Sequence, residues 1–390
     1  MRGWQAFLLV IVAALVGLAT GSRSIQMAAL ALAALLIIAV LYRTLLVGDV
    51  RGIRQVSDSI VSWGDSFAQR ITLTNRARLA IPAIRVTDLS TLPDHPHGYV
   101  TSLPARRSVT WDVEIPCQQR GRYRLGPVET HMSDPLGLFP VSRLVGAATS
   151  VLVLPRWVPL NRCALRLDGF LPGEARGRRR GESPPSFYSV REYAVGDNIA
   201  TIHWPASARS GQLMTKLFDP EIQTTLWLAL DLDGSLSHDV EELLVTAAVS
   251  LGVYALHRAN LRVGLLASGD VSVQLPSERG KPHQYRMQEV LAEVRAGDEV
   301  ALNDLLTKLD RRLGPGQVVV LLTSRGPEAW GTALNRLARK GVAARVVNVS
   351  DTSAGWAVPA ISLSPTLADP AREAALIQQL EHGAASGGEG

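Results

Sequence analysis

Residues 191–233, REYAVGDNIATIHWPASARSGQLMTKLFDPEIQTTLWLALDLD, decide how this chain is organised. Charged and aromatic side chains surround a Gly-Asp turn, and the stretch then runs into a continuous apolar segment, Thr225 to Leu230. A strand that is apolar at every position is typical of a sheet covered on both faces. The stretch therefore marks the entrance to an α/β domain.

Strands and helices alternate after this entrance. Apolar residues recur at helical spacing within residues 240–254, which predicts an amphipathic helix. The same patterns predict further strands at 261–266, 317–323 and 342–347, and helices at 283–295, 302–313 and 328–340. Such repetition predicts a doubly wound parallel sheet. We assign residues 225–370 to this α/β domain and 371–390 to a C-terminal helix end and flexible tail.

The region before the entrance is rich in short strands. Val109, Trp111 and Val113 alternate with polar residues, which is the pattern of a half-buried strand. Turn-forming residues separate several such segments, so residues 50–160 are expected to form a small all-β sandwich. Residues 161–224 are assigned to a linker and to the charged segment that begins the stretch quoted above. The first part of this range is rich in Gly, Pro, Arg and Ser, as a linker is expected to be.

The N-terminus holds two uncharged apolar runs, Trp4 to Thr20 and Ile25 to Tyr42. Each run approaches the roughly 20 residues that cross a bilayer. A cleavable signal peptide is the alternative for the first run, but the second follows closely, so we expect a transmembrane helical hairpin over residues 1–45. Arginines flank the hairpin on its outer sides, which predicts that both termini and the soluble domains are cytoplasmic, at a bacterial-type inner (plasma) membrane.

Composition excludes several classes of protein. Of the 390 residues only two are cysteines, Cys117 and Cys163, which fits neither a disulfide framework nor a Cys-x-x-Cys metal site. No nucleotide-binding or hydrolase motif of the glycine-rich kinds occurs. The net charge is +5. Part of it is an arginine run at 176–180, which is expected to be solvated or to contact anionic lipid, and nucleic acid is not expected as a partner.

The strongest candidate for a ligand site is Asp231, Asp233 and Ser235. They follow the first strand of the α/β domain, and ligands of open parallel sheets sit at the carboxyl ends of strands. Carboxylates and a hydroxyl there suit a hard cation such as Mg²⁺. Thr323 and Arg325 stand at the end of another strand. The positive charge of an arginine beside such a site would repel a metal cation. The alternative is that the two aspartates cap the loop and the next helix.

The segment from Arg191 to Lys216 is the second candidate. It is interpreted either as a docking surface or as a clasp that joins the β domain to the α/β domain through buried ion pairs. Trp204 is expected to anchor the segment by burying its ring. The residues assigned to this group are Arg191, Tyr193, Gly196, Asp197, Trp204, Ser207, Arg209 and Lys216.

Several segments together resemble one family, the domain of unknown function 58 proteins. Beyond residues 191–233, they are the stretches RGRYRLGP at 120–127, DPLGLF at 134–139 and VLPR at 153–156. The resemblance implies a membrane anchor and a von Willebrand factor type A-like domain. It also implies partnership with a MoxR-type AAA+ ATPase, with transglutaminase-like or von Willebrand type A membrane proteins as further candidate partners.

The sequence therefore predicts a non-enzymatic, membrane-anchored interaction protein that assists the assembly or maturation of other proteins, without a cofactor. Two alternatives stay open. One is an adhesion module that depends on Mg²⁺, for which Asp233 departs from the Asp-x-Ser-x-Ser motif of type A domains. The other is an uncharacterised hydrolase that uses Asp231 and Asp233.

Overall fold

The computed structural model describes the chain over residues 2–46, 50–93, 98–134, 136–165, 187–194, 199–218, 225–297, 302–349 and 360–383. Two compact units form, Met1–Arg156 and Trp157–Gly390. The break falls a few residues before the domain boundary expected at residue 160. Each unit is described by itself below.

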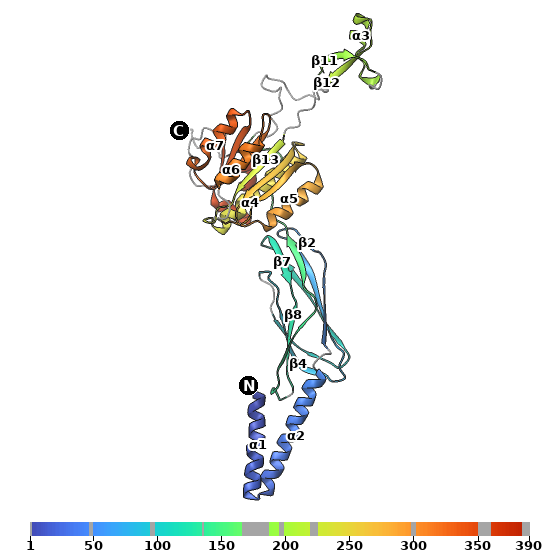
Figure 1. The fold of residues 1–390 in the computed structure, drawn as a ribbon, viewed down its shortest axis with the longest axis vertical. Helices are drawn as coiled ribbons and strands as arrows, with labels where there is room; N and C mark the ends of the chain where they lie inside the picture. Colours follow the sequence, from blue (N-terminus) through green and yellow to red (C-terminus); the bar gives the residue numbers. More distant parts are fainter. Residues whose placement is uncertain are drawn as a thin grey trace. The chain divides into compact units, whose positions relative to one another are not determined.

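The first unit begins with two helices that lie side by side, α1 (Arg2–Thr20) and α2 (Arg23–Leu46) (Figure 1). They meet near their connection, where Nε2 of Gln26 donates a hydrogen bond to the carbonyl of Gly17 at 3.1 Å. The α2 helix is long and apolar enough to cross a membrane, and α1 contributes a shorter apolar stretch, Trp4–Thr20. Large apolar side chains on both helices are exposed, as a lipid-facing surface requires.

In the described part of the first unit, strands β1 to β10 follow α2. Their bounds are β1 (Val50–Val56), β2 (Ile60–Val61), β3 (Ser66–Asn75), β4 (Ile81–Asp88), β5 (Gly98–Leu103), β6 (Ser108–Pro116), β7 (Gly121–Leu125), β8 (Val128–Met132), β9 (Val141–Val145) and β10 (Thr149–Val153). They form three sheets, with strand orders β1-β3-β6, β2-β10-β7 and β5-β4-β8-β9.

The β1-β3-β6 sheet is one layer of this domain and the other two sheets face it. Ile71 and Leu73 of β3 pack with Ile81 and Ile84 of β4 in one core. Further along β3, Phe67 packs with residues of β2, β6, β7 and β10 in a second core. Alternate residues of β3 are buried, which is the period-two pattern expected of a sheet with one face inside.

The second unit contains a two-stranded sheet and a larger α/β part. The small sheet pairs β11 (Phe187–Glu192) with β12 (Met214–Phe218) in antiparallel register, so that Arg191 lies opposite Thr215. A short 3-10 helix, η2 (Ile199–Thr201), and helix α3 (Trp204–Ser210) lie between these strands in the sequence. Ring nitrogen Nδ1 of His203 accepts the amide hydrogen of Ala206 and caps α3.

The α/β part is built on a six-stranded mixed sheet of order β15-β14-β13-β16-β17-β18. Its strands are β13 (Thr225–Asp231), β14 (Arg262–Ser268), β15 (Val273–Glu278), β16 (Val318–Thr323), β17 (Ala343–Val349) and β18 (Ala360–Leu363). Only the pairing of the edge strand β15 with β14 is antiparallel. Strands β13 and β16 are buried at every residue, so the sheet is covered on both faces.

Helices cover the two faces of this sheet in separate groups. Helices α4 (His238–His257), α5 (Lys281–Glu293) and α8 (Glu373–His382) pack in one core. Helices α6 (Leu302–Arg312) and α7 (Pro327–Arg339) pack in the other, with Trp227 and Trp330 (Figure 1). Short 3-10 helices η3 (Pro365–Ala368) and η4 (Pro370–Arg372) precede α8. Although α4 is apolar enough to span a membrane, 83% of its apolar window is buried, which identifies it as a core helix.

Candidate functional site

The carboxyl ends of β13 and β16 form the candidate site. These strands are neighbours at the centre of the sheet, and the chain proceeds from β13 to β14 on one side and reaches β16 on the other. In an open α/β sheet, ligands bind outside the carboxyl ends of the strands at such a reversal of strand order. The fold therefore places the ends of β13 and β16 where a ligand site is expected.

Asp231 is the last residue of β13, and its side chain lies almost wholly inside the protein. Its Oδ2 accepts a hydrogen bond of 2.7 Å from Oγ1 of Thr323, the last residue of β16. Burial raises the pKa of Asp231, although hydrogen bonds from Thr323 and Ser268 and the charge of Arg325 act in the opposite direction. The carboxylate is thus buried, and the neighbouring strands supply its partners.

Arg325 lies between the two aspartates. Its Nε is 3.2 Å from Oδ2 of Asp231, and its Nη2 forms an ion pair with Oδ2 of Asp233. The other oxygen of Asp233 accepts hydrogen bonds from the amide of Ser235, at 2.8 Å, and from the Ser235 hydroxyl. The guanidinium therefore occupies the place between the carboxylates at which a cation would be expected.

The backbone of Arg325 is fixed by the fold around it. Its amide donates to Oγ1 of Thr323 at 3.0 Å, and its carbonyl accepts hydrogen bonds from Nε1 of Trp330 and Nδ2 of Asn348 at 3.1 and 2.7 Å. Trp330 and Asn348 are both buried, on α7 and β17. Three elements thus hold the arginine at the edge of the sheet, and its side chain remains 38% exposed.

The three predicted cation ligands, Asp231, Asp233 and Ser235, do come together, but their present arrangement does not fit a divalent cation. A guanidinium bound to both carboxylates repels a second positive charge and occupies ligand oxygens that Mg²⁺ needs. Within the described residues, no group of three or more His, Cys, Asp or Glu side chains is placed to hold a metal. Binding of Mg²⁺ at this site stays a prediction.

The two aspartates were considered as caps of the loop and of the helix that follows it. In the structure, different residues fill these two roles. Asp233 does hold the loop, through its contacts with Ser235. The helix that follows is instead capped by Ser237, whose side chain accepts the amide hydrogen of Val240. The aspartates are therefore not needed as helix caps, and Asp231 bonds across the sheet.

The second predicted group, between Arg191 and Lys216, falls on the β11–α3–β12 segment. Gly196 and Asp197 lie outside the described residues, as does the arginine run at 176–180. Ser207 is buried, and its hydroxyl accepts the amide hydrogen of Met214 at 2.8 Å and donates to the carbonyl of His203. Ser207 therefore joins α3 to β12.

The remaining residues of this group have separate surroundings. The amide of Tyr193 donates to the carbonyl of Leu213 at 2.8 Å, Nη1 of Arg191 donates to the carbonyl of Glu192, and Arg209 is exposed. Lys216 lies opposite Val190 in the two-stranded sheet. The expected burial of Trp204 is wrong, because its side chain is 64% exposed at the first turn of α3. Its ring therefore does not anchor this segment from within.

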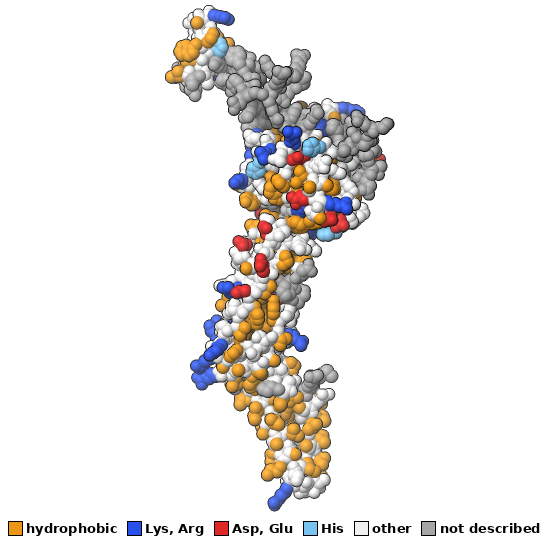
Figure 2. Space-filling model, turned by 180° about the vertical axis from the view of Figure 1, so that it is seen from behind, with side chains coloured by type: hydrophobic (Ala, Val, Ile, Leu, Met, Phe, Trp, Pro, Cys, Tyr) orange, Lys and Arg blue, Asp and Glu red, His pale blue; other side chains and the backbone are white. Residues whose placement is uncertain are grey.

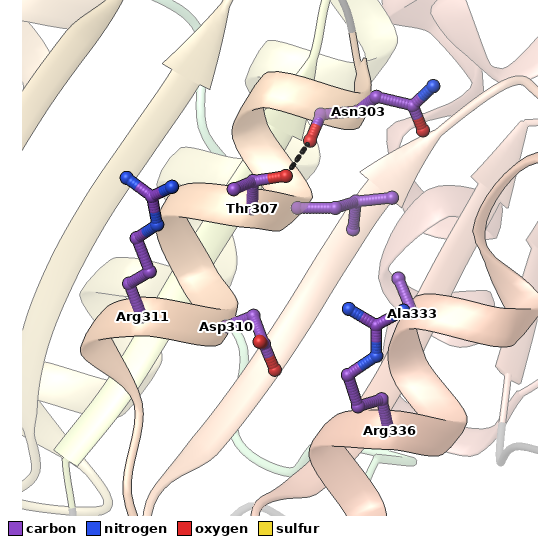
Figure 3. A pocket seen from close by; sticks show the side chains of 7 residues that line it. Asn303, Thr307, Asp310, Arg311, Ala333 and Arg336 are labelled. Atoms are coloured by element: carbon purple, nitrogen blue, oxygen red, sulfur yellow. Dashed lines mark hydrogen bonds between the residues drawn. The ribbon is translucent and has the colours of Figure 1, made fainter.

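A hollow of about 210 Å³ lies between α6 and α7 (Figure 3). Figure 3 shows Asp310 on α6 and Arg336 on α7 beside it. The Asp310 carboxylate already forms an ion pair of 2.8 Å with Nζ of Lys340. Asp310 also precedes β16, so it belongs to the amino end of that strand, whereas ligand sites of such sheets lie at the carboxyl end. We therefore do not assign a ligand to this hollow.

Relatives of this chain in bacteria include proteins that are named only as uncharacterised. It is 24% identical over 337 residues to the uncharacterised protein YeaD of Bacillus subtilis, covering 75% of this chain and 82% of the relative. It is 26% identical over 186 residues to an uncharacterised protein of Mycobacterium tuberculosis, covering 45% of this chain and 58% of that protein. The chain thus spans less than two thirds of the mycobacterial relative.

Similar solved structures cover parts of the chain. The CARDB domain of a Pyrococcus furiosus protein is 13% identical and covers 27% of this chain and 88% of its own, with a TM-score of 0.22. Proximal thread matrix protein 1 of the mussel byssus is 11% identical, with coverages of 40% and 47% and a TM-score of 0.30. Likenesses this weak do not define the fold.

One family description applies to the segment that contains the candidate site. The matched segment begins within β11 and ends at the start of η4, so it includes Asp231 at the end of β13 and Arg325 just after β16. Residues 189–370 match the family described as "Protein of unknown function DUF58", and over this segment the resemblance drawn from residues 191–233 is confirmed.

Proposed function

We propose that this chain is a membrane-anchored, non-enzymatic interaction protein of the DUF58 family, whose α/β part presents the carboxyl edge of its sheet to a protein partner. The observation that carries the proposal is the position of Arg325, which compensates Asp231 and Asp233 at the reversal of strand order. An edge with a built-in cation has a fixed arrangement of charge and can bind a partner without a cofactor.

The surroundings of Asp231 favour binding over catalysis. A carboxylate that acts as a general base must reach the proton that it removes, and its oxygen must be free to accept that proton. Asp231 is only 2% exposed, and its Oδ2 is engaged by Thr323 and Arg325. The exposed part of the Arg325 guanidinium and the Ser235 side chain lie further out, where a protein surface can reach them.

The two N-terminal helices support the membrane anchor. Their side chains are apolar over most of both lengths, and the segment that links them is only Gly21 and Ser22. With arginines outside the hairpin, the proposal places both termini and the two folded units in the cytoplasm. The membrane proposed is the inner (plasma) membrane of a bacterial-type cell.

The proposed partner is a MoxR-type AAA+ ATPase, and the joint task is the assembly or maturation of other proteins. The family resemblance supplies this partner, and the sequence is compatible with it because it lacks a Gly-x-x-x-x-Gly-Lys motif of its own. ATP-driven work would then come from the partner. Transglutaminase-like and von Willebrand type A membrane proteins are further candidates, and the α/β part is proposed to be of the latter type.

Affinity capture of the full chain in detergent, with and without ATP, tests the proposal. A MoxR-type ATPase should be retained by the wild type and lost with the double variant Asp231→Asn/Asp233→Asn. The matched control is Asp304→Asn, which removes an exposed carboxylate from α6. Equal retention of the ATPase by the double variant, or its absence from all captures, would refute the proposed use of this edge.

One alternative has a specific observation in its favour. Side chains of Asp231, Asp233, Ser235 and Thr323 converge on one region, as a metal-dependent adhesion module needs. In that case Mg²⁺ would have to displace Arg325. Calorimetry of the full chain with Mg²⁺ and Mn²⁺ separates the two proposals, since binding in the millimolar range or tighter supports the adhesion module.

A further inference from the structure

The first unit carries a cluster of arginines on the loops next to the apolar helices. Arg76 and Arg78 lie between β3 and β4, and Arg106 and Arg107 lie between β5 and β6. All four side chains are exposed. The two loop sequences, RARLA at 76–80 and PARR at 104–107, contain no acidic residue. The result is a strongly positive surface, which we call the arginine loops.

Backbone hydrogen bonds join the two arginine loops to each other. The amide of Asn75 donates to the carbonyl of Arg107 at 2.9 Å, and the amide of Arg106 donates to the carbonyl of Ala77 at 3.2 Å. Nδ2 of Asn75 also donates to the carbonyls of Leu103 and Pro104. The four guanidinium groups are therefore presented by one ordered piece of backbone.

The end of α2 contacts the same loops. The hydroxyl of Tyr42 donates to the carbonyl of Ala80 at 2.5 Å, and the Tyr42 ring packs against the adjacent β core. Tyr42 is also the last residue of the second apolar run. Tyrosine at the end of an apolar helix is typical of the boundary between hydrocarbon and headgroups. If α2 spans a bilayer, the arginine loops lie at headgroup level.

A third loop adds apolar side chains at this end. It connects β8 to β9, and the Phe139 ring lies 6.2 Å from the ring of Phe7 on α1, measured between centroids. Leu136 in the same loop is 50% exposed. Asp134, the acidic residue beside them, is buried and accepts the amide hydrogens of Leu136 and Phe139. Its carboxylate is therefore engaged by the backbone of its own loop and is not exposed on this surface.

Two more arginines extend the positive surface. Arg43 on α2 and Arg51 on β1 are exposed, and Arg51 and Arg76 line a hollow of about 440 Å³ together with the apolar side chains of Ile53 and Leu144. Among the described residues, none of these six arginines forms an ion pair. Figure 2 shows Lys and Arg side chains gathered on the β domain where the apolar helices begin.

We propose that the arginine loops, with Arg43 and Arg51, bind the phosphate headgroups of anionic phospholipids and hold the β domain against the membrane surface. Unpaired guanidinium groups suit phosphate oxygens, because they offer several N–H donors in a planar fork. Anionic lipids of the cytoplasmic leaflet attract basic residues next to a membrane segment. This inference rests on the proposed membrane anchor and on its cytoplasmic orientation.

The test uses the full chain reconstituted into lipid nanodiscs, with an environment-sensitive fluorophore on the variant Leu136→Cys. Discs contain either phosphatidylcholine alone or phosphatidylcholine with phosphatidylglycerol, plus a trace of phospholipid with a nitroxide on its headgroup. The native cysteines, Cys117 and Cys163, are buried and stay unlabelled. Quenching reports how closely residue 136 approaches the headgroups.

We expect quenching about twofold stronger in the anionic discs, because each arginine near such a surface contributes roughly fivefold in affinity. The variant Arg76→Gln/Arg78→Gln/Arg106→Gln/Arg107→Gln should lose this difference, whereas the matching set of four lysine substitutions should keep it. Replacement of two exposed arginines of β7, Arg122→Gln/Arg124→Gln, is the control for charge alone. A label on Asp58→Cys, in the turn between β1 and β2, should show equal quenching in both discs.

Two failures can be told apart. If the protein leaves lipid vesicles in a flotation experiment at high salt, the membrane anchor itself is refuted. If it floats with the vesicles but quenching at residue 136 is the same in both discs, or unaffected by the four glutamine substitutions, the anchor stands and headgroup binding by the arginine loops is refuted.

Discussion

Nε of Arg325 lies 3.2 Å from Oδ2 of Asp231, the same oxygen that receives the hydroxyl hydrogen of Thr323 at 2.7 Å. Thr323 is the last residue of β16 and Arg325 lies two residues beyond it, so the end of one strand and the loop after it supply a hydrogen-bond donor and a cation to the carboxylate of the neighbouring strand. This carboxylate is buried, and an isolated charge there would be costly. The arginine therefore serves as a built-in counter-ion at the place where a parallel sheet usually binds ligands.

Removal of this counter-ion should create a cation site. With Arg325→Ala, two carboxylates and two hydroxyl groups would face a space without a positive charge, which suits a divalent cation. We expect binding of Mg²⁺ or Mn²⁺ with a Kd on the order of 1 mM in the variant, as measured by calorimetry, and none at that concentration in the wild type.

A matched variant is Arg311→Ala, which removes an exposed arginine of α6. It should leave metal binding as in the wild type. The triple variant Arg325→Ala/Asp231→Asn/Asp233→Asn should bind no metal. Binding of Mg²⁺ by the wild type with the same affinity as by Arg325→Ala would show that the arginine does not compete with the cation.

The stability of the α/β part should depend on the titration of Asp231. Burial raises the pKa of this carboxyl in the folded protein above its ordinary value of about 4. Between these two pKa values the folded state binds more protons than the unfolded state, so the free energy of unfolding falls as pH rises through this window. The contribution of Asp231 to the free energy of unfolding is thus largest in acid and is lost above the folded-state pKa.

The variant Asp231→Asn should remove this part of the pH dependence. Hydrogen exchange of the β13 amides, followed by mass spectrometry from pH 4 to pH 7, reports local opening after correction for intrinsic exchange rates. The free energy of local opening of the wild type, relative to that of the variant, should fall as the pH rises. A difference that is constant over this range would contradict the raised pKa.

A buried ion pair in the β domain provides a test of packing. Nη2 of Arg54 on β1 lies 2.6 Å from Oδ1 of Asp88 on β4, and both side chains are almost fully buried. Gln69 on β3 bonds to both partners, with its Oε1 2.6 Å from Nη1 of Arg54. The pair thus ties together the two facing layers of the domain, where a lone charge would be poorly solvated.

Each single substitution, Arg54→Met or Asp88→Leu, should cost about 3 kcal/mol of unfolding free energy, because it leaves the other charge buried without its partner. The double variant should cost less than the sum of the two, since no unpaired charge remains. Chemical denaturation of the full chain in detergent, followed by tryptophan fluorescence, measures the cycle. Additive costs would mean that the two side chains do not stabilise each other.

Cys117 should report unfolding of the β domain. Its side chain is buried, and burial together with the nearby Asp65 raises the pKa of the thiol to about 11. A thiol is nucleophilic only as the thiolate, so maleimide at neutral pH should modify it slowly in the native protein and quickly in denaturant. Peptide mapping distinguishes Cys117 from Cys163. Rapid native labelling of Cys117 would contradict its burial.

The sequence predicted the local elements well where a pattern repeats. The strands predicted at 225–230, 261–266 and 317–323 correspond to β13, β14 and β16, and the helices between them are within a few residues of those predicted. The spacing of apolar residues along a segment is a local property, so it can be recognised without knowledge of the fold. Edge strands β15 and β18 were not predicted, because a short strand at an edge has a weak pattern.

The candidate site was predicted only in part. Asp231, Asp233 and Ser235 are close in sequence, at the end of β13 and in the loop after it, so their proximity followed from the sequence. Arg325 was expected near them at the end of a strand. The ion pair of Arg54 with Asp88 and the contact between Tyr42 and Ala80 were not foreseen. Each joins residues more than 30 positions apart, and no local pattern specifies such partners. Trp204 was wrongly expected to be buried, because aromatic character alone does not distinguish a core residue from an exposed one.

The orientation of the membrane anchor is the last expectation to be tested. Arg43, Arg51 and Arg54 follow the hairpin, whereas only Arg23 lies next to its connection, at the start of α2. Segments with an excess of Lys and Arg remain on the cytoplasmic side. Alkaline phosphatase is active only outside the cytoplasm and green fluorescent protein fluoresces when made inside it, so fusions of each after residue 390 should give low phosphatase activity and high fluorescence. A fusion after Thr20 should give the reverse result, because it lies beyond the first crossing. High phosphatase activity for the fusion after residue 390 would place both folded units outside the cytoplasm and would exclude direct contact with a cytoplasmic ATPase.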